Sequence, residues 1–176
     1  VIFTHSHPDH RGGAGAFLGS APEIIAFAPK TPALEGSELL QQIQNRRGSR
    51  QFGYTLTDEE NISQGIGRRE GVVYGEHRAF TAPSTVYQED SVSREIDGIL
   101  LEMARLPGET DDQICVWLPQ KRVLCCGDNY YGCFPNFYAI RGGQYRDLSA
   151  WKKSIDALLA YPADYLLPGH TSVIYG

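Results

Sequence analysis

A histidine-rich segment near the start of the sequence constrains the fold more than any other feature. Three histidines, His5, His7 and His10, lie with Asp9 within six residues, directly after an apolar run at 1–3. Imidazole nitrogens and carboxylate oxygens are ligands of zinc and similar cations. In an extended segment His5 and His7 project to one side, while Asp9 and His10 follow once the chain turns. We therefore predict a metal site at the end of a strand; an ordinary polar turn is the alternative.

Length and composition fit a single domain with a normal core. The chain has 176 residues, of which 41% are hydrophobic. No apolar run approaches the roughly 20 residues of a membrane helix, and no basic block suggests nucleic acid. The formal charge is −5, and two divalent cations would bring it to −5 + 4 = −1, so part of the acidity is expected to be ligand charge. The four cysteines form no C-x-x-C pair and are predicted to be reduced thiols.

The beginning of the sequence leads us to expect residues before it. The first residue is Val1, and the only methionine is Met103. A strand that starts at residue 1 and runs into a metal loop needs neighbouring strands, which are not in the sequence. We expect the natural N-terminus, with any targeting signal, to precede Val1, so the compartment, cytoplasmic or periplasmic, stays open.

Alternating strand-like and helix-like segments predict an α/β layer fold. Asp97-Gly98 is typical of a hairpin turn. Either Asp147 or Ser149 can cap the last helix. The predicted elements are a short helix with Ala14, Phe17 and Leu18, a strand at 23–28, a helix from Pro32 carrying Leu39, Leu40 and Ile43, strands within 86–103, a hairpin of 114–118 and 123–126, a helix with Trp151 and Ile155, and a strand at 165–167.

An irregular stretch separates the early elements from the later strands. Residues at about 45–83 contain many glycines and charges and show little periodicity. Irregular stretches of this length inside a domain are usually lids or binding loops. We predict a lid-like insertion, with a plain surface excursion as the alternative, and assign no metal role to His77 within it.

Three later residues follow or precede apolar strands at glycine-containing turns. Asp128 ends the most apolar strand, where a carboxylate is costly unless it is paired or binds a cation. His170 follows Pro168-Gly169 at the end of the last strand. Glu109 stands in Leu-Pro-Gly-Glu, with Asp111 and Asp112 as competitors and an ordinary hairpin acid as the alternative.

The run His5-x-His7-x-Asp9-His10 resembles the first metal motif of the metallo-β-lactamase superfamily. This resemblance implies an αββα sandwich, here a partial catalytic domain that lacks its N-terminal strands. Glu109, Asp128 and His170 stand where the superfamily places its remaining ligands, with Glu109 in place of the more common histidine. The implied ligands are His5, His7 and Glu109 for one ion, Asp9, His10 and His170 for the other, and Asp128 as the bridge.

The implied activity is hydrolysis at a two-metal centre. Paired ions can share a water and lower its pKa toward about 7, which supplies a metal-bound hydroxide at neutral pH. We assign catalytic roles to Asp9 and Asp128. The expected cofactors are two zinc ions, with manganese or iron as alternatives.

Residues 136–147, together with Glu109 and Trp151, resemble the alkylsulfatase branch of this superfamily. The resemblance implies hydrolysis of alkyl sulfate esters, an anionic small-molecule substrate. A guanidinium fork suits a sulfate group, so we predict that Arg141 and Asn136 bind it. Arg146 is also assigned to substrate binding, although it can instead neutralise the acidic ligands. An aromatic-rich stretch could line an apolar slot or be core: Tyr130, Tyr131, Phe134, Phe137 and Tyr138.

Two departures from the branch leave the substrate open. Asp128 replaces a usual glutamate, and Pro135 replaces a common histidine just before Asn136, which removes a possible proton donor. The alternatives are another hydrolase of the fold, acting on a lactone, thioester or phosphoester, a di-iron redox protein, or an inactive domain. The branch's dimerisation segment and C-terminal domain would lie after Gly176, so the parent protein is expected to be a homodimer.

Overall fold

The computed structural model describes residues 1–31, 38–62, 81–143 and 145–176, and only the backbone of residues 38–41. The predicted lid role of 63–80, including His77, and the predicted helix start at Pro32 therefore lie outside the described residues.

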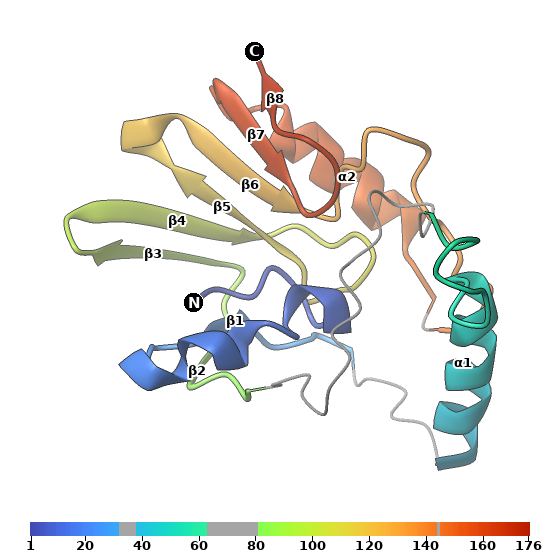
Figure 1. Cartoon of the computed structure of the whole chain (residues 1–176). Coiled ribbons are helices and arrows are strands. Elements are labelled where there is room, and N and C mark those ends of the chain that lie inside the picture. The colour runs from blue at the N-terminus through green and yellow to red at the C-terminus, as the bar shows by residue number, and fades with distance from the viewer. Residues whose placement is uncertain (32–37, 63–80, 144) are drawn as a thin grey trace.

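Two sheets and flanking helices form the described part of the chain (Figure 1). The small parallel sheet pairs β1 (Ile25–Phe27) with β2 (Thr85–Tyr87). The large sheet has strand order β3-β4-β5-β6-β7-β8. Its strands are β3 (Ser91–Ile96), β4 (Ile99–Arg105), β5 (Ile114–Leu118), β6 (Val123–Gly127), β7 (Tyr165–Pro168) and β8 (Ile174–Tyr175). The architecture is that of the predicted α/β class.

Both predicted hairpins are present. Strands β3 and β4 are joined at Asp97 and Gly98, whose φ angles of 52° and 76° match the left-handed turn expected there. Strands β5 and β6 are joined by the 3₁₀ turn η3 (Pro119–Lys121). β6 then pairs in parallel with β7, so the ends that carry Asp128 and, beyond Gly169, His170 meet at one edge of the sheet.

The large sheet is covered on both faces, as the continuous apolar runs of β5 and β6 predict. On one face, Ile114 and Val116 pack with Ile25 and Phe27 of the small sheet. On the other face, a second cluster packs against α2 (Leu148–Leu158): Cys115, Trp117, Leu124, Cys126 and Leu158. All four cysteines are free thiols, as expected.

The N-terminal segment lies between the two sheets. Phe3 N donates to Ile25 O at 2.9 Å, and Ile114 N donates to Thr4 O at 2.9 Å. Residues 1–4 thus contact β1 on one side and β5 on the other, although only Ile2 forms a ladder bridge. This position delivers the following histidines to the junction of the two sheets.

Two sequence predictions about helices need correction. The segment after the metal loop is the 3₁₀ helix η2 (Ala14–Ser20), with Phe17 and Leu18 exposed, because only Ala14 reaches the core. Helix α1 (Glu38–Gln51) extends into the stretch predicted to be irregular from residue 45. Within the described residues, no helix is both long and apolar enough to cross a membrane.

Candidate metal centre

The histidine-rich segment folds as a tight turn directly after the N-terminal strand-like residues. His5 is 2% exposed, and its Nδ1 lies 3.2 Å from Thr4 Oγ1. The 3₁₀ turn η1 (Pro8–His10) then carries Asp9 and His10 back over the sheet edge, closed by a bond from Gly12 N to Pro8 O at 2.8 Å. The turn places all four predicted ligand side chains of this segment on one edge.

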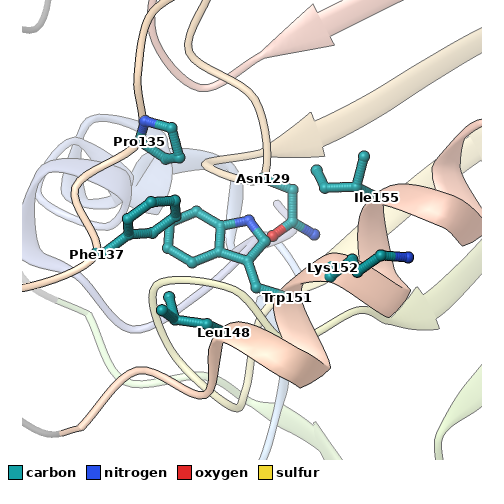
Figure 2. A pocket seen from close by; sticks show the side chains of 7 residues that line it. All are labelled: Asn129, Pro135, Phe137, Leu148, Trp151, Lys152 and Ile155. Carbon is teal, nitrogen blue, oxygen red and sulfur yellow. The ribbon is translucent and has the colours of Figure 1, made fainter.

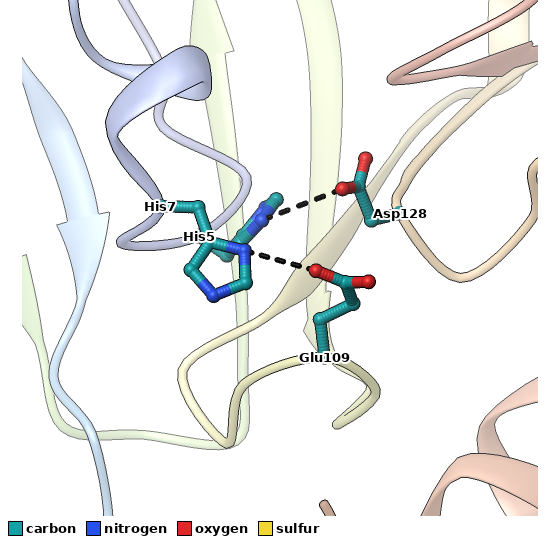
Figure 3. A group of neighbouring side chains, drawn as sticks. All are labelled: His5, His7, Glu109 and Asp128. Carbon is teal, nitrogen blue, oxygen red and sulfur yellow. Dashed lines mark ion pairs between the residues drawn. The ribbon is translucent and has the colours of Figure 1, made fainter. Parts of the chain in front are cut away.

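The seven predicted ligand side chains gather in two adjacent groups. The first contains His5, His7, Glu109 and Asp128, and the second contains Asp9, His10 and His170. Within each group one donor atom per residue lies within 4.8 Å of the others. Figure 3 shows the first group, with His7 Nδ1 3.0 Å from Glu109 Oε2.

Asp128 lies between the two groups. Its Oδ2 is 3.8 Å from His5 Nε2 in the first group, and 3.2 Å and 3.4 Å from Nε2 of His10 and His170 in the second. Asp9 Oδ2 approaches the same two nitrogens of the second group, at 3.2 Å and 3.3 Å. One oxygen of Asp128 therefore faces both groups, which is the position of a bridging ligand.

The donor atoms converge, but several of them lack a hydrogen-bond partner. Nε2 of His5, Nε2 of His10 and Oδ1 of Asp128 are buried and have no well-directed hydrogen-bond partner among the described residues. Buried polar atoms are normally paired, so such a set needs an explanation. A divalent cation in each group supplies one, and two imidazoles with one or two carboxylates in each group suit zinc. The residues therefore fit a dinuclear metal centre.

The electrostatics of the cluster depend on burial and on the facing charges. Burial, with the neighbouring His10 and His7, lowers the pKa of His5 to about 3. Burial alone would also lower the pKa of His10, but the Asp128 and Asp9 carboxylates outweigh it and raise this pKa to about 9. The same carboxylates raise the pKa of His170 to about 10.

The two aspartates of the cluster shift in the opposite direction. Burial opposes ionisation of Asp9 and Asp128, yet contact with His10 and His170 holds the pKa of both carboxyls well below the usual range. Both are therefore ionised at neutral pH.

Two glycines allow close approach at the centre. Gly108 and Gly169 both follow Leu-Pro and precede a predicted ligand, Glu109 or His170. A Cβ on Gly169 would overlap Asp128 Oδ1 and come within 2.7 Å of His10 Cε1. A Cβ on Gly108 would overlap Asn129 Oδ1. A side chain at Gly169 would therefore displace predicted donors, and one at Gly108 would displace Asn129.

Two residues, Arg146 and Tyr131, hold the carboxylate of Glu109, which also faces His7. Both Nη atoms of Arg146 contact the carboxylate, Nη1 to Oε1 at 2.6 Å and Nη2 to Oε2 at 3.1 Å. Tyr131 Oη donates to Oε1. No metal-centre role is predicted for Tyr131 from the sequence, because an aromatic residue in an irregular loop carries no signal of this kind. For Arg146 this geometry favours neutralisation of the acidic ligands over substrate binding.

Arg141 and Asn136 lie on the loop between β6 and α2. Arg141 Nη1 donates to Gln51 Oε1 at 3.4 Å, and its guanidinium carbon lies 5.5 Å from the centre of the Phe52 ring. Burial and the charge of Arg146 lower the pKa of Arg141, while Glu109 and Asp9 act in the opposite direction. Arg141 is thus within electrostatic range of both ligand groups. Asn136 is partly buried, and its backbone carbonyl accepts from Arg146 Nη1.

The competing acids near Glu109 point elsewhere. Asp112 Oδ1 accepts from Ser6 Oγ at 3.3 Å, and Asp111 Oδ2 accepts from Thr31 N at 2.7 Å. Neither belongs to the two groups formed by the described residues.

An apolar cavity of about 220 Å³ lies beside α2 (Figure 2). Trp151 lines it, with the Phe137 ring 5.8 Å away at a right angle. Of the aromatic residues predicted to form a slot, only Phe137 lines this cavity; Tyr131 instead is buried against Glu109. The lining residues are Asn129, Pro135, Phe137, Leu148, Trp151, Lys152 and Ile155.

Comparison with known proteins matches residues 1–170 to the family model of the metallo-beta-lactamase superfamily. The chain is 31% identical over its whole length to a linear primary-alkylsulfatase of a Pseudomonas species, and covers 34% of that protein. It is also 31% identical over 89% of its length to an alkyl/aryl-sulfatase of Saccharomyces cerevisiae, and covers 25% of it.

A solved structure shows the same similarity in three dimensions. The stereoselective inverting sec-alkylsulfatase Pisa1 from a Pseudomonas species superposes with a TM-score of 0.83 at 26% identity, over all of this chain and 30% of that one. The chain thus spans about a third or less of the length of these relatives. The family match, the fold and the converging ligand set agree: this chain belongs to the metallo-β-lactamase superfamily.

Proposed function

We propose that this chain is part of a dinuclear metal-dependent hydrolase that cleaves alkyl sulfate esters. The observation that carries the metal centre is the position of Asp128, whose Oδ2 faces donor atoms of both ligand groups at 3.2–3.8 Å. The sulfate ester comes from the similarity to alkylsulfatases, whose names state that substrate class.

In this proposal His5, His7 and Glu109 hold one ion, Asp9, His10 and His170 hold the other, and Asp128 is shared. The ions, zinc by ligand type, supply Lewis acidity that brings the pKa of a water near neutrality and stabilises an anionic transition state. The protein supplies the fixed spacing, since the donors come from residues 5–10 and from the loops after β4, β6 and β7.

Asp9 and Asp128 are the proposed catalytic carboxylates. Because contact with His10 and His170 lowers the pKa of both, they are ionised at neutral pH. They can therefore orient a water and accept a proton from it, but they cannot protonate the departing oxygen. The position that could carry a histidine donor is Pro135, so the proton for the leaving group comes from elsewhere.

Arg141 is the proposed sulfate-binding residue, with Asn136 as a second donor. A sulfate ester carries one delocalised negative charge, which a guanidinium can contact through two hydrogen bonds. The contacts with Gln51 and Phe52 hold Arg141 against helix α1. Its electrostatic coupling to Glu109 and Asp9 supports a site next to the metal ligands.

The test is sulfate release from a medium-chain alkyl sulfate by the full-length, zinc-loaded protein. Arg141→Ala should reduce kcat/KM by at least about tenfold, since a lost charged hydrogen bond is worth about 1.5–3 kcal/mol. Arg141→Lys should recover part of it by keeping the charge. Arg122→Ala is the control, because Arg122 pairs with Asp164 at the other end of β6.

The outcomes separate the parts of the proposal. Zinc binding without sulfate release would keep the metal centre and remove the sulfate ester in favour of a lactone, thioester or phosphoester. Full turnover by Arg141→Ala would keep the activity and remove the assignment of Arg141. Iron with a visible absorption band, in place of zinc, would favour a redox protein.

A further inference from the structure

The predicted ligand Glu109 carries a charge that is nearly buried. Its side chain is only 7% exposed, and that of Arg146 is only 4% exposed. A buried carboxylate is costly unless it is paired and hydrogen-bonded. Arg146 meets both requirements, because its two Nη atoms contact the two carboxylate oxygens in parallel.

The two oxygens of Glu109 have different surroundings. Oε1 accepts from Arg146 Nη1 and from Tyr131 Oη. Oε2 accepts from Arg146 Nη2 and lies 3.0 Å from His7 Nδ1, on the side of the first ligand group. The contacts on Oε1 therefore fix the carboxylate so that Oε2 is directed at the group.

We propose that Arg146 and Tyr131 are positioning residues of the metal centre, which hold Glu109 with Oε2 as its single ligand atom and neutralise its charge. Arg146 and Glu109 together add no net charge to the first group, so His5, His7 and the Glu109–Arg146 pair act as three neutral ligands beside Asp128. Partners of this kind tune metal affinity by about 10–100-fold.

The same two residues connect Glu109 to other parts of the site. Arg146 Nη1 also donates to Asn136 O, in the loop proposed to bind the substrate. The Tyr131 ring lies 5.9 Å from the His170 ring of the second group. Loss of Arg146 would thus loosen Glu109 and the Asn136 loop together, whereas loss of the Tyr131 hydroxyl would remove only one of three hydrogen bonds to Glu109.

The experiment measures zinc affinity of the full-length protein by competition with a chromophoric chelator, without substrate. Arg146→Met should lower the affinity for one of the two zinc ions about 10–100-fold. Arg146→Lys should recover part of this loss, since it keeps the charge but not the two parallel bonds. Tyr131→Phe should have a smaller effect. Arg122→Met, which removes an exposed two-bond pair with Asp164, should bind zinc like the unaltered protein.

A double-mutant cycle with Glu109→Gln separates positioning from general stability. If Arg146 acts through Glu109, Arg146→Met changes zinc affinity little once Glu109 is replaced by glutamine. The double variant, Arg146→Met with Glu109→Gln, contains no unpaired buried carboxylate. It should therefore fold even if Arg146→Met alone fails to fold. The cobalt-substituted protein gives a second readout, because a displaced ligand alters its visible spectrum.

Two results would overturn the inference. One is wild-type zinc affinity in Arg146→Met together with a raised KM, which would make Arg146 a substrate-binding residue. The other is an equal loss of affinity in both backgrounds of the cycle, which would make its role purely structural. The inference rests on the proposed metal centre but not on the sulfate ester, so failure of sulfate turnover with zinc bound would leave it standing.

Discussion

At the scale of single residues, the centre depends on contacts that leave no room for a side chain at Gly169. We expect Gly169→Ala to abolish binding of at least one metal ion, because its Cβ would overlap Asp128 Oδ1 and crowd His10 Cε1. Metal content after dialysis measures this. Gly13→Ala is the control, since a Cβ there meets nothing within 4 Å. Full metal content in Gly169→Ala would contradict the packing of this loop.

The protonation of the histidines predicts how metal binding responds to pH. With pKa values raised to about 9 and about 10, His10 and His170 hold their protons at pH 7 until a cation displaces them, whereas His5, with a pKa of about 3, has none to lose. Zinc binding at pH 7 should therefore release about two protons, and apparent affinity should rise with pH toward 9. Calorimetry in buffers of different ionisation enthalpy measures the release. A heat of binding that is independent of buffer would refute this prediction.

The gathering of the predicted ligand side chains was predictable from the sequence at this scale, and their supporting residues were not. His5, His7, Asp9 and His10 stand together in the chain, so residue type and spacing are enough to suggest a cation. The contact of Arg146 with Glu109 depends on the path of an irregular loop between β6 and α2, which no periodicity describes. From the sequence, Arg146 could therefore be assigned to substrate binding as readily as to neutralisation of an acidic ligand.

At the scale of elements, the start of α2 is fixed by its N-cap Asp147, the residue after Arg146. Asp147 Oδ1 accepts from Ser149 N at 2.9 Å and from Ala150 N at 3.0 Å. Asp147→Ala should lower the free energy of unfolding by about 1 kcal/mol. Urea unfolding measures this change in the free energy of unfolding. Asp156→Ala, which removes only the exposed pair with Lys152, should cost about 0.3–0.5 kcal/mol. Equal effects of the two changes would argue against the cap.

The strands followed their sequence patterns, but the last turns of α1 did not. Continuous apolar runs and the Asp97-Gly98 turn predict β5, β6 and the β3–β4 hairpin because burial and turn geometry are local requirements. Leu39, Leu40 and Ile43 mark only the first half of α1, and residues 44–51 are polar apart from the buried Gly48. No apolar stripe marks these last turns, so the sequence predicts irregular structure from residue 45.

At the scale of the whole molecule, the proposed metal centre joins segments that are far apart in sequence. Its donors come from residues 5–10 between the two sheets and from loops after β4, β6 and β7. A ligand that binds only the folded state stabilises it by about 4 kcal/mol at a thousandfold excess over its dissociation constant. Removing metal with a chelator should therefore lower the melting temperature, and zinc should restore it while calcium, which prefers all-oxygen sites, should not. Identical melting with and without zinc would exclude this stabilising role.

The order of the ligands along the chain has a consequence for biosynthesis. The first ligand group is complete once Asp128 has left the ribosome, whereas the second waits for His170, after the whole of α2 and β7. In the proposed centre, the residues of the group that contains Glu109 are therefore all synthesised before those of the group that contains His170.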